Sequence, residues 1–254
     1  AALAAGNCKK KAQESGTPPE PTGQTAAPTT PAEPAKATEP TKPPEPAVEP
    51  TEPTEPAKVE GPAAVLDKEI EAAGGLDNLK AKLAAVTIDS EGTFFGKPYK
   101  ATTYWMAPDR MVINIVEMEM AMGYTPEACW STMGEIVVDC MKEEQEYSGE
   151  GLSYMHAMNL YALKDEGVQA EAAGEADLGG TAAVGVKVSG GFLKMPVTFF
   201  FAKDSGLLLK ATYDGHFGME QGTIEYVYSD HKDFDGVKLP GASTMTLNGK
   251  EIMT

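Results

Sequence analysis

The distribution of proline and aromatic residues divides this chain at about Pro62. Residues 1–62 contain 14 of the 19 prolines and none of the Phe, Tyr or Trp side chains, the first of which is Phe94. A segment without large apolar side chains cannot bury a core, and proline removes the backbone donors that helices and sheets need. We therefore expect a disordered, Pro/Glu/Thr-rich linker over residues 9–62, extended like polyproline, and one globular domain over residues 63–254.

The charge of the globular domain excludes one class of partner. Residues 63–254 contain 15 Lys and Arg against 29 Asp and Glu, a net charge of −14. A domain this acidic repels a phosphate backbone, so we expect no nucleic-acid partner. No apolar run in the sequence reaches the roughly 20 residues of a membrane-spanning helix.

The first eight residues resemble the end of a bacterial lipoprotein signal peptide. Small apolar residues (AALAAGN) precede Cys8, and three lysines follow it. In such signals, cleavage before the cysteine leaves its thiol free for a diacylglycerol with acyl chains such as palmitate. The alternative is a stray cysteine in a disordered tail. Because Asp does not follow Cys8, we expect a lipid anchor in the outer membrane, on its periplasmic or surface face, with the linker as a stalk.

The hydrophobic periodicity predicts an α+β fold. Apolar residues at helical spacing predict helices over 63–73 and 76–83, separated by Gly74-Gly75, and a third from Leu152 to before Gly167. Alternating apolar residues predict the strands of an antiparallel meander, over 86–95, 97–106, 111–120, 182–188, 197–202, 207–213, 223–228, 237–239 and 243–247. The sequence therefore predicts one large antiparallel sheet with a few helices.

Two cysteines of the domain fit one hairpin. If Gly134-Glu135 is a two-residue turn, Met133 faces Ile136 and Cys129 faces Cys140. Directly opposed Cβ atoms lie about 4.5–5.5 Å apart, which is close to disulfide range. In an oxidising compartment we expect a disulfide between Cys129 and Cys140, although two unlinked thiols are the alternative.

No catalytic or metal-binding motif stands out. HExxH, GxSxG and Walker sequences are absent, and His156, His216 and His231 each have the context of an ordinary surface or half-buried residue. The segment from His231 fails as a calcium loop because its twelfth position is Ala242, and a hairpin turn at Asp235-Gly236 explains it better. We expect a protein that is not an enzyme and has no cofactor or metal.

The order of several short motifs resembles the periplasmic outer-membrane lipoprotein-sorting family, the relatives of the lipoprotein carrier and its outer-membrane receptor. The matching stretches are LDKEIEAAGGLDNL from Leu66, LYALKDEG from Leu160, FAKDSGLLLK from Phe201 and YSDHKDFDGVKLP from Tyr228. The resemblance implies a strongly curved antiparallel sheet, an incomplete barrel, with helices on its concave side and an apolar cavity that accepts acyl chains. Such relatives generally add one or two strands after the 237–240 region, so the chain is either a fragment or has a shorter sheet.

In a half-barrel, alternate residues of each strand face the concave side. The 13 methionines suit either a packed core or a pliable lipid pocket, and both interpretations stay open. Which alternate residues of each strand face inward is also left open, because apolar residues lie on both faces. The candidate ligand-binding residues are Tyr104, Met111, Ile113, Ile115, Met155, Met158, Phe199, Phe201 and Tyr226.

Two functions follow from these features. The first is a membrane-anchored lipoprotein, expected to be monomeric, whose cavity binds lipid or the acyl chains of a lipoprotein. Because the chain is tethered, this role is closer to a receptor than to a shuttle. The second is a structural or interaction lipoprotein of the cell envelope with a packed core and no ligand.

Overall fold

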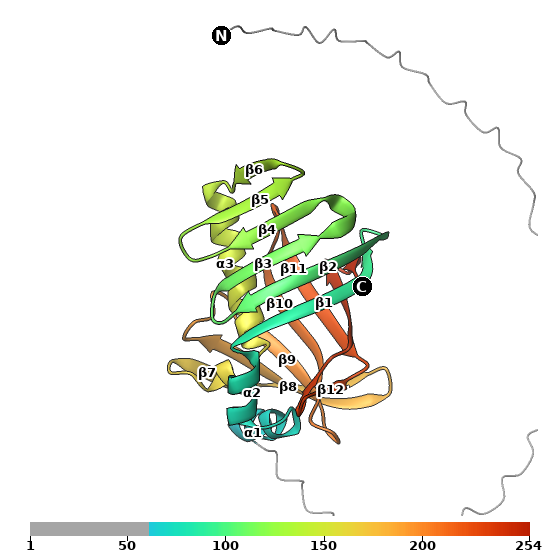
Figure 1. Ribbon diagram of the computed structural model, residues 1–254. Coiled ribbons are helices and arrows are strands. Elements are labelled where there is room, and N and C mark those ends of the chain that lie inside the picture. The colour runs from blue at the N-terminus through green and yellow to red at the C-terminus, as the bar shows by residue number, and fades with distance from the viewer. Residues whose placement is uncertain (1–60) are drawn as a thin grey trace, which may run out of the picture. The chain divides into compact units, whose positions relative to one another are not determined.

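The computed structural model describes residues 61–254 (Figure 1). The expectations for Cys8 and for the linker up to residue 60 lie outside these residues. Among the described residues no helix is long and apolar enough to cross a membrane.

Thirteen strands form one open antiparallel sheet that curves strongly (Figure 1). Strands β6 and β7 are its two edges. In spatial order the strands are β6 (Ile136–Asp139), β5 (Cys129–Met133), β4 (Met120–Tyr124), β3 (Arg110–Ile115), β2 (Lys97–Met106), β1 (Ala85–Phe94), β15 (Lys250–Met253), β14 (Ala242–Leu247), β11 (Glu220–Ser229), β10 (Leu208–Phe217), β9 (Val197–Ala202), β8 (Thr181–Gly190) and β7 (Val168–Leu178). A separate hairpin pairs β12 (Lys232–Phe234) with β13 (Val237–Leu239).

Strand β15 joins the two halves of this sheet. Met253 of β15 pairs with Phe94 of β1 on one side and with Met245 of β14 on the other. The Phe95 amide donates to the Ile252 carbonyl at 2.7 Å, which extends the ladder. Strands β1–β6 form one half-sheet, and strands β7–β11 with β14, here called the β7–β14 half-sheet, form the other; the two are connected in the middle through β15.

The helices lie at one end of the sheet and inside its curve. Helix α1 (Pro62–Ala72) and helix α2 (Leu76–Leu83) are separated by Gly74 and Gly75, whose positive φ values of 127° and 84° allow the sharp turn. Helix α3 (Lys142–Ala157) passes behind β3–β5 in Figure 1 and contacts both β10 and β5. It is followed by the short 3₁₀ helix η2 (Tyr161–Lys164). The α+β, incomplete-barrel class predicted from the sequence is confirmed.

The main differences from the predicted elements are two wrong boundaries and two missed strands, β7 and β15. The expected strand 111–120 is β3 and β4, because η1 (Val116–Met118) and Glu119, with a φ of 48°, reverse the chain between them. Helix α3 begins ten residues before Leu152: the Glu144 carboxylate accepts the Met141 amide at 2.8 Å and caps its start. Strand β7 was missed because its Ala- and Glu-rich sequence has low strand propensity.

The main core lies between the β7–β14 half-sheet and the helices. Its side chains come from α1, α2, α3, η2 and from strands β8–β11 and β14. The largest fully buried residues include Phe199, Phe201, Ile224 and Met245. Burial of this apolar surface, at about 25 cal/mol per Å², supplies most of the driving force for folding.

Candidate functional site

The register of β1–β6 places one set of apolar side chains on the inner face of the sheet. Val86 on β1 packs against the main core, so its face is the inner one. Val86 pairs with Trp105, Trp105 with Met111, and Met111 with Tyr124. The row below consists of Ile88, Thr103, Ile113 and Met122. This face, here called the inner apolar face, consists of Val86, Ile88, Trp105, Met111, Ile113, Ile115, Met120, Met122, Tyr124, Cys129, Met133, Ile136 and Val138.

The two half-sheets differ in how completely their inner faces are covered. In β8–β10 the inward side chains of Val186, Phe199 and Ala211 have no exposed surface. On the inner apolar face, by contrast, Met111, Ile113 and Met122 are only half-buried. Exposure rises toward the edge, where Ile136 is 66% and Met133 is 73% exposed. One half of the barrel is thus filled by its own core. The other presents apolar surface that the described residues cover only in part, since Trp105 is 3% exposed but Ile88 is 42% exposed.

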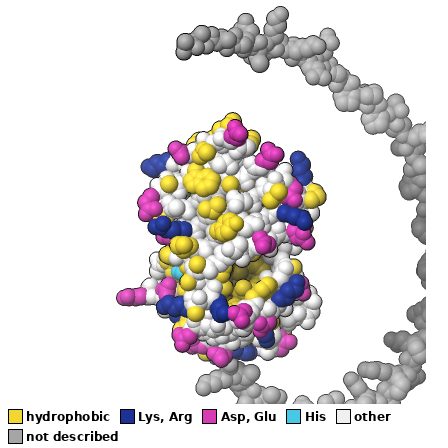
Figure 2. Space-filling view, viewed as in Figure 1, with side chains coloured by type: hydrophobic (Ala, Val, Ile, Leu, Met, Phe, Trp, Pro, Cys, Tyr) yellow, Lys and Arg dark blue, Asp and Glu magenta, His cyan; other side chains and the backbone are white. Residues whose placement is uncertain are grey.

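Figure 2 shows a hollow in the face in view. The face in view is recessed below strand β1, and hydrophobic side chains line the recess. In Figure 1 this place lies between the front half-sheet and the strands behind it. The apolar lining is what an acyl chain would require, since each buried CH₂ contributes about 0.8 kcal/mol.

Helix α3 is attached to the opposite half-sheet by a cluster of four tyrosines. Tyr154 of α3 lies among Tyr213 of β10 and Tyr226 and Tyr228 of β11, with ring centroids 4.7 Å from Tyr213 and 5.0 Å from Tyr226. The hydroxyl groups of Tyr154 and Tyr228 are hydrogen-bonded, and Tyr228 donates to Met158 Sδ at 3.4 Å. Either hydroxyl group can be the donor within the tyrosine pair, and when Tyr228 donates to the sulfur atom, Tyr154 donates to Tyr228.

Burial keeps these phenols protonated. It raises the pKa values of Tyr154 and Tyr228 well above their usual range; neighbouring tyrosines add to the effect for Tyr154, whereas the hydrogen bond with Tyr154 opposes it for Tyr228. Burial also raises the pKa of Tyr226 to about 12. The cluster is therefore neutral at physiological pH, and its hydroxyl groups act as hydrogen-bond donors and acceptors only.

A polar contact continues the same face of α3 toward the sheet edge. The Glu150 carboxylate accepts the backbone amide of His216 at 3.0 Å and lies 3.0 Å from its Nδ1. The Tyr147 ring stacks on the His216 ring with centroids 3.8 Å apart. Tyr147, Glu150, Tyr154 and Met158 follow three- and four-residue steps, so a single helical face holds α3 on β10 and β11.

The structure distributes the predicted ligand-binding residues over five places. Met111, Ile113 and Ile115 lie together on the inner apolar face. Tyr104 pairs with Val112 and points to the outer face, 49% exposed. Phe199 and Phe201 are completely buried in the main core. Tyr226 belongs to the tyrosine cluster, and Met155 and Met158 lie half-buried on α3.

Sequence reasoning missed several residues of the inner apolar face. Val86, Ile88, Met120, Met122 and Tyr124 share this face with the predicted residues. The methionine cluster was a usable signal for two of them, but the undetected reversal at 116–119 hid the pairing of β3 with β4. The sequence alone could not show which alternate residues of each strand face inward, because this depends on how the strands pair.

The predicted hairpin is present with the predicted register. Met133 pairs with Ile136 and Thr132 with Val137. The Cα atoms of Cys129 and Cys140 are 5.3 Å apart, and their sulfur atoms are within bonding distance. The hairpin therefore places the edge of the sheet close to Met141, the residue before the first turn of α3.

One of the three histidines, His156, differs from the expectation of a surface or half-buried residue. His156 is buried, not at the surface, because the Phe192 ring packs 4.6 Å from its ring and α3 is covered on more than one side. Burial lowers the pKa of His156, although Asp165, 3.7 Å away, opposes the shift.

The turn at Asp235-Gly236 is present as predicted, with positive φ at both residues. Within residues 61–254 no group of His, Cys, Asp and Glu side chains could hold a metal ion.

The fold is similar to those of solved proteins. A DUF1329 family protein from Desulfovibrio piger superposes with a TM-score of 0.51 at 12% identity, covering 77% of this chain and 90% of that chain. A LolA superfamily protein from Nitrosomonas europaea gives 0.47 at 11%, with the same coverages. A domain from Vibrio parahaemolyticus assigned to outer membrane lipoprotein sorting gives 0.43 at 8%, covering 72% and 86%.

No protein-family model matches the chain, and no curated protein matches it. At such low identities the likeness concerns the fold. The chain therefore has the open, curved antiparallel sheet with helices inside the curve that the sequence resemblance implied.

Proposed function

We propose that this protein is a non-enzymatic, membrane-anchored lipoprotein that binds lipid or the acyl chains of a lipoprotein on the inner apolar face. The observation that carries the proposal is the difference between the half-sheets. Phe199 is completely buried, whereas Ile88, on the corresponding face of β1, is 42% exposed. A fold with only one packed half has room for an apolar ligand in the other.

The position of α3 supports the same role. The helix is held on β10 and β11 by the tyrosine cluster and by Glu150, so it forms one wall of the space. The half-buried methionines Met111, Met120 and Met122 form part of the other wall. Flexible thioether side chains suit acyl chains of differing shape.

The sequence supplies the cellular context of the proposal. Acylation of Cys8 would anchor the domain in the outer membrane, and the Pro-rich linker would let a monomer reach ligands away from the bilayer. Mass spectrometry of the N-terminal peptide tests the anchor. A Cys8→Ser variant should leave the membrane fraction, and retention there would contradict lipidation.

Native mass spectrometry after mild extraction tests the binding function. We expect the domain to carry non-covalent lipid, and residues 61–254 produced without lipid to bind a fluorescent fatty acid. An empty domain that never binds the probe would support the second function, a structural lipoprotein without a ligand. The dense packing around Phe199 and Phe201 is the feature that favours this second function.

A further inference from the structure

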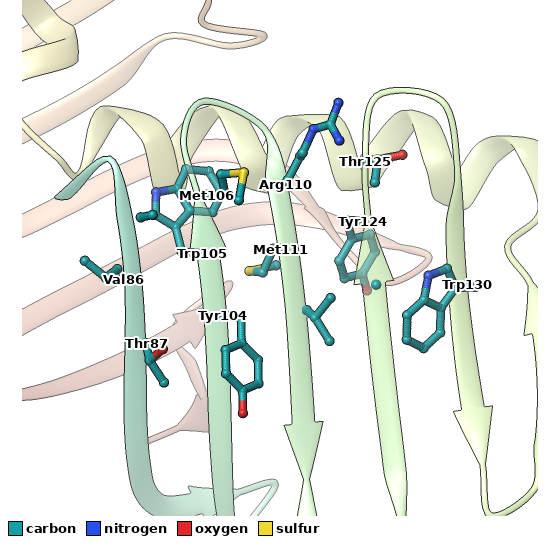
Figure 3. A pocket seen from close by; sticks show the side chains of 13 residues that line it. Val86, Thr87, Tyr104, Trp105, Met106, Arg110, Met111, Tyr124, Thr125 and Trp130 are labelled. Atoms are coloured by element: carbon teal, nitrogen blue, oxygen red, sulfur yellow. The ribbon is translucent and has the colours of Figure 1, made fainter.

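The outer face of β1–β5 has a groove with a volume of about 500 Å³ (Figure 3). One wall is a row of side chains that the register aligns across the strands: Thr87, Tyr104, Val112 and Trp130. The other wall lies two residues further along each strand and consists of Ala85, Met106, Arg110 and Thr125. We call this the outer groove.

The floor of the outer groove is backbone. Val86, Trp105, Met111 and Tyr124 also line it, but they belong to the row whose side chains point to the inner apolar face. Because successive side chains of a strand alternate between faces, these residues present only their main chain to the outside. The groove is therefore separate from the inner apolar face, with the thickness of the sheet between them.

Gly123 provides the space for the aromatic end of the groove. It pairs with Trp130, and a Cβ atom at Gly123 would overlap the Trp130 indole ring. The ring thus leans over β4 toward Val112 and Tyr104. The result is an apolar wall of aromatic and aliphatic side chains on the outer face.

The dimensions of the groove fit a single extended chain. Its walls are two residues apart along the strands, about 7 Å at 3.3–3.4 Å per residue. It crosses β1 to β5, four spacings of about 4.8 Å, or roughly 19 Å. One alkyl chain fits this width, whereas two chains side by side do not.

The groove also has one cation without a counterion among the described residues. Arg110 is the only arginine of the chain, is exposed, and has no ion pair or hydrogen bond to any of the residues that the structure describes. Lys100, a cation of the same face outside the groove, is instead paired with Glu91 at 3.3 Å. A guanidinium on β3, halfway along one wall of an apolar groove in an otherwise acidic domain, is complementary to a carboxylate.

We infer that the outer groove binds a single-chain amphipathic anion of the fatty-acid class, with its carboxylate on Arg110 of β3 and its alkyl chain running from Val112 across β4 to Trp130 of β5. The ligand differs from that of the inner apolar face in having one chain and a required negative charge. The site and the proposed function do not depend on each other.

The two tryptophans allow each face to be tested alone. Trp105 points to the inner face and Trp130 lines the outer groove. In Trp105→Phe, 9,10-dibromostearic acid should quench the fluorescence of Trp130 saturably, because bromine atoms quench an indole in close contact. Arg110→Gln in this background should weaken the binding at least about tenfold, as expected for losing a charge-assisted hydrogen bond. Lys100→Gln is the matched control and should change nothing.

The methyl ester of the same acid supplies the second control. It has the same chain without the charge, so it should bind weakly and with no dependence on Arg110. Absence of Trp130 quenching, or equal affinity in Arg110→Gln, would overturn the inference. If Trp105→Phe does not fold by circular dichroism, the difference in quenching between the wild type and Trp130→Phe answers the same question.

Failure of the outer groove leaves the proposed function testable. In Trp130→Phe the remaining Trp105 reports on the inner apolar face. Quenching of Trp105 without quenching of Trp130 contradicts the outer groove alone. Quenching of Trp130 alone contradicts ligand binding on the inner apolar face.

Discussion

Tyr154 on helix α3 and Tyr228 on strand β11 share a hydrogen bond between their hydroxyl groups in the buried space between helix and sheet. The two residues are 74 positions apart in the chain. Their contact is the polar centre of the interface that holds α3 against β10 and β11, and so it sets one wall of the proposed binding space.

The first prediction concerns this pair. Tyr154→Phe should lower the free energy of unfolding by about 1–2 kcal/mol, because the hydroxyl of Tyr228 loses a buried partner. Tyr228→Phe should cost a similar amount, and the double variant should cost less than the sum of the two. Urea denaturation of all four proteins measures the coupling. Additive costs would show that the hydroxyl groups do not depend on each other.

The second prediction compares Phe199 with Ile113. Phe199→Glu places a carboxylate in the fully packed core and should unfold the domain, at a cost of several kcal/mol. Ile113 lies on the half-buried inner apolar face, so Ile113→Glu in the Trp130→Phe background should stay folded but lose the quenching of Trp105 by a brominated fatty acid. Circular dichroism and probe titration separate the effects. A folded Ile113→Glu protein with unchanged affinity would exclude the inner apolar face as the site.

The third prediction concerns the edge hairpin. A disulfide between Cys129 and Cys140 closes a loop with a sequence separation of 11, so reduction should lower the free energy of unfolding by about 2–3 kcal/mol. Cys140→Ser should match the reduced wild type and should not respond to reductant. Rapid alkylation of both cysteines in the native, unreduced protein would contradict the disulfide.

The fourth prediction concerns pH. Glu69 on α1 is 2% exposed, and burial raises its pKa from 4.5 to about 8, although Lys68 opposes the shift. Between these values the unfolded state releases a proton that the folded state retains, so stability should fall as the pH rises from about 4.5 to about 8. Glu69→Gln should remove this part of the pH dependence and be more stable than the wild type at pH 8.

The exposed Glu71 on the same helix is the control for this prediction. Glu71→Gln should leave the pH dependence of unfolding as it is in the wild type. Equal slopes for the wild type and Glu69→Gln between pH 5 and pH 8 would show that Glu69 does not titrate across this interval.

Much of the fold could be predicted from local sequence. Helix α2 and strands β2, β9 and β13 have the predicted boundaries, because their apolar periodicity and flanking turn residues agree. The register of the hairpin from Cys129 followed from its two-residue turn. The reversal at Glu119 was not predictable, since the alternation of apolar residues continues through it.

The sequence by itself determined the class of the domain, most of its strands and the turns at Gly134-Glu135 and Asp235-Gly236. Only the tertiary structure decided which face of each strand is inside, because parity depends on pairing between distant strands and on β15, which joins β1 to β14. Phe199 and Ile113 look alike in sequence, as alternating apolar residues of a strand. Phe199 is core and Ile113 is only half-buried, because side chains of α1, α3 and η2 pack mainly against the half of the sheet that contains β8–β11 and β14.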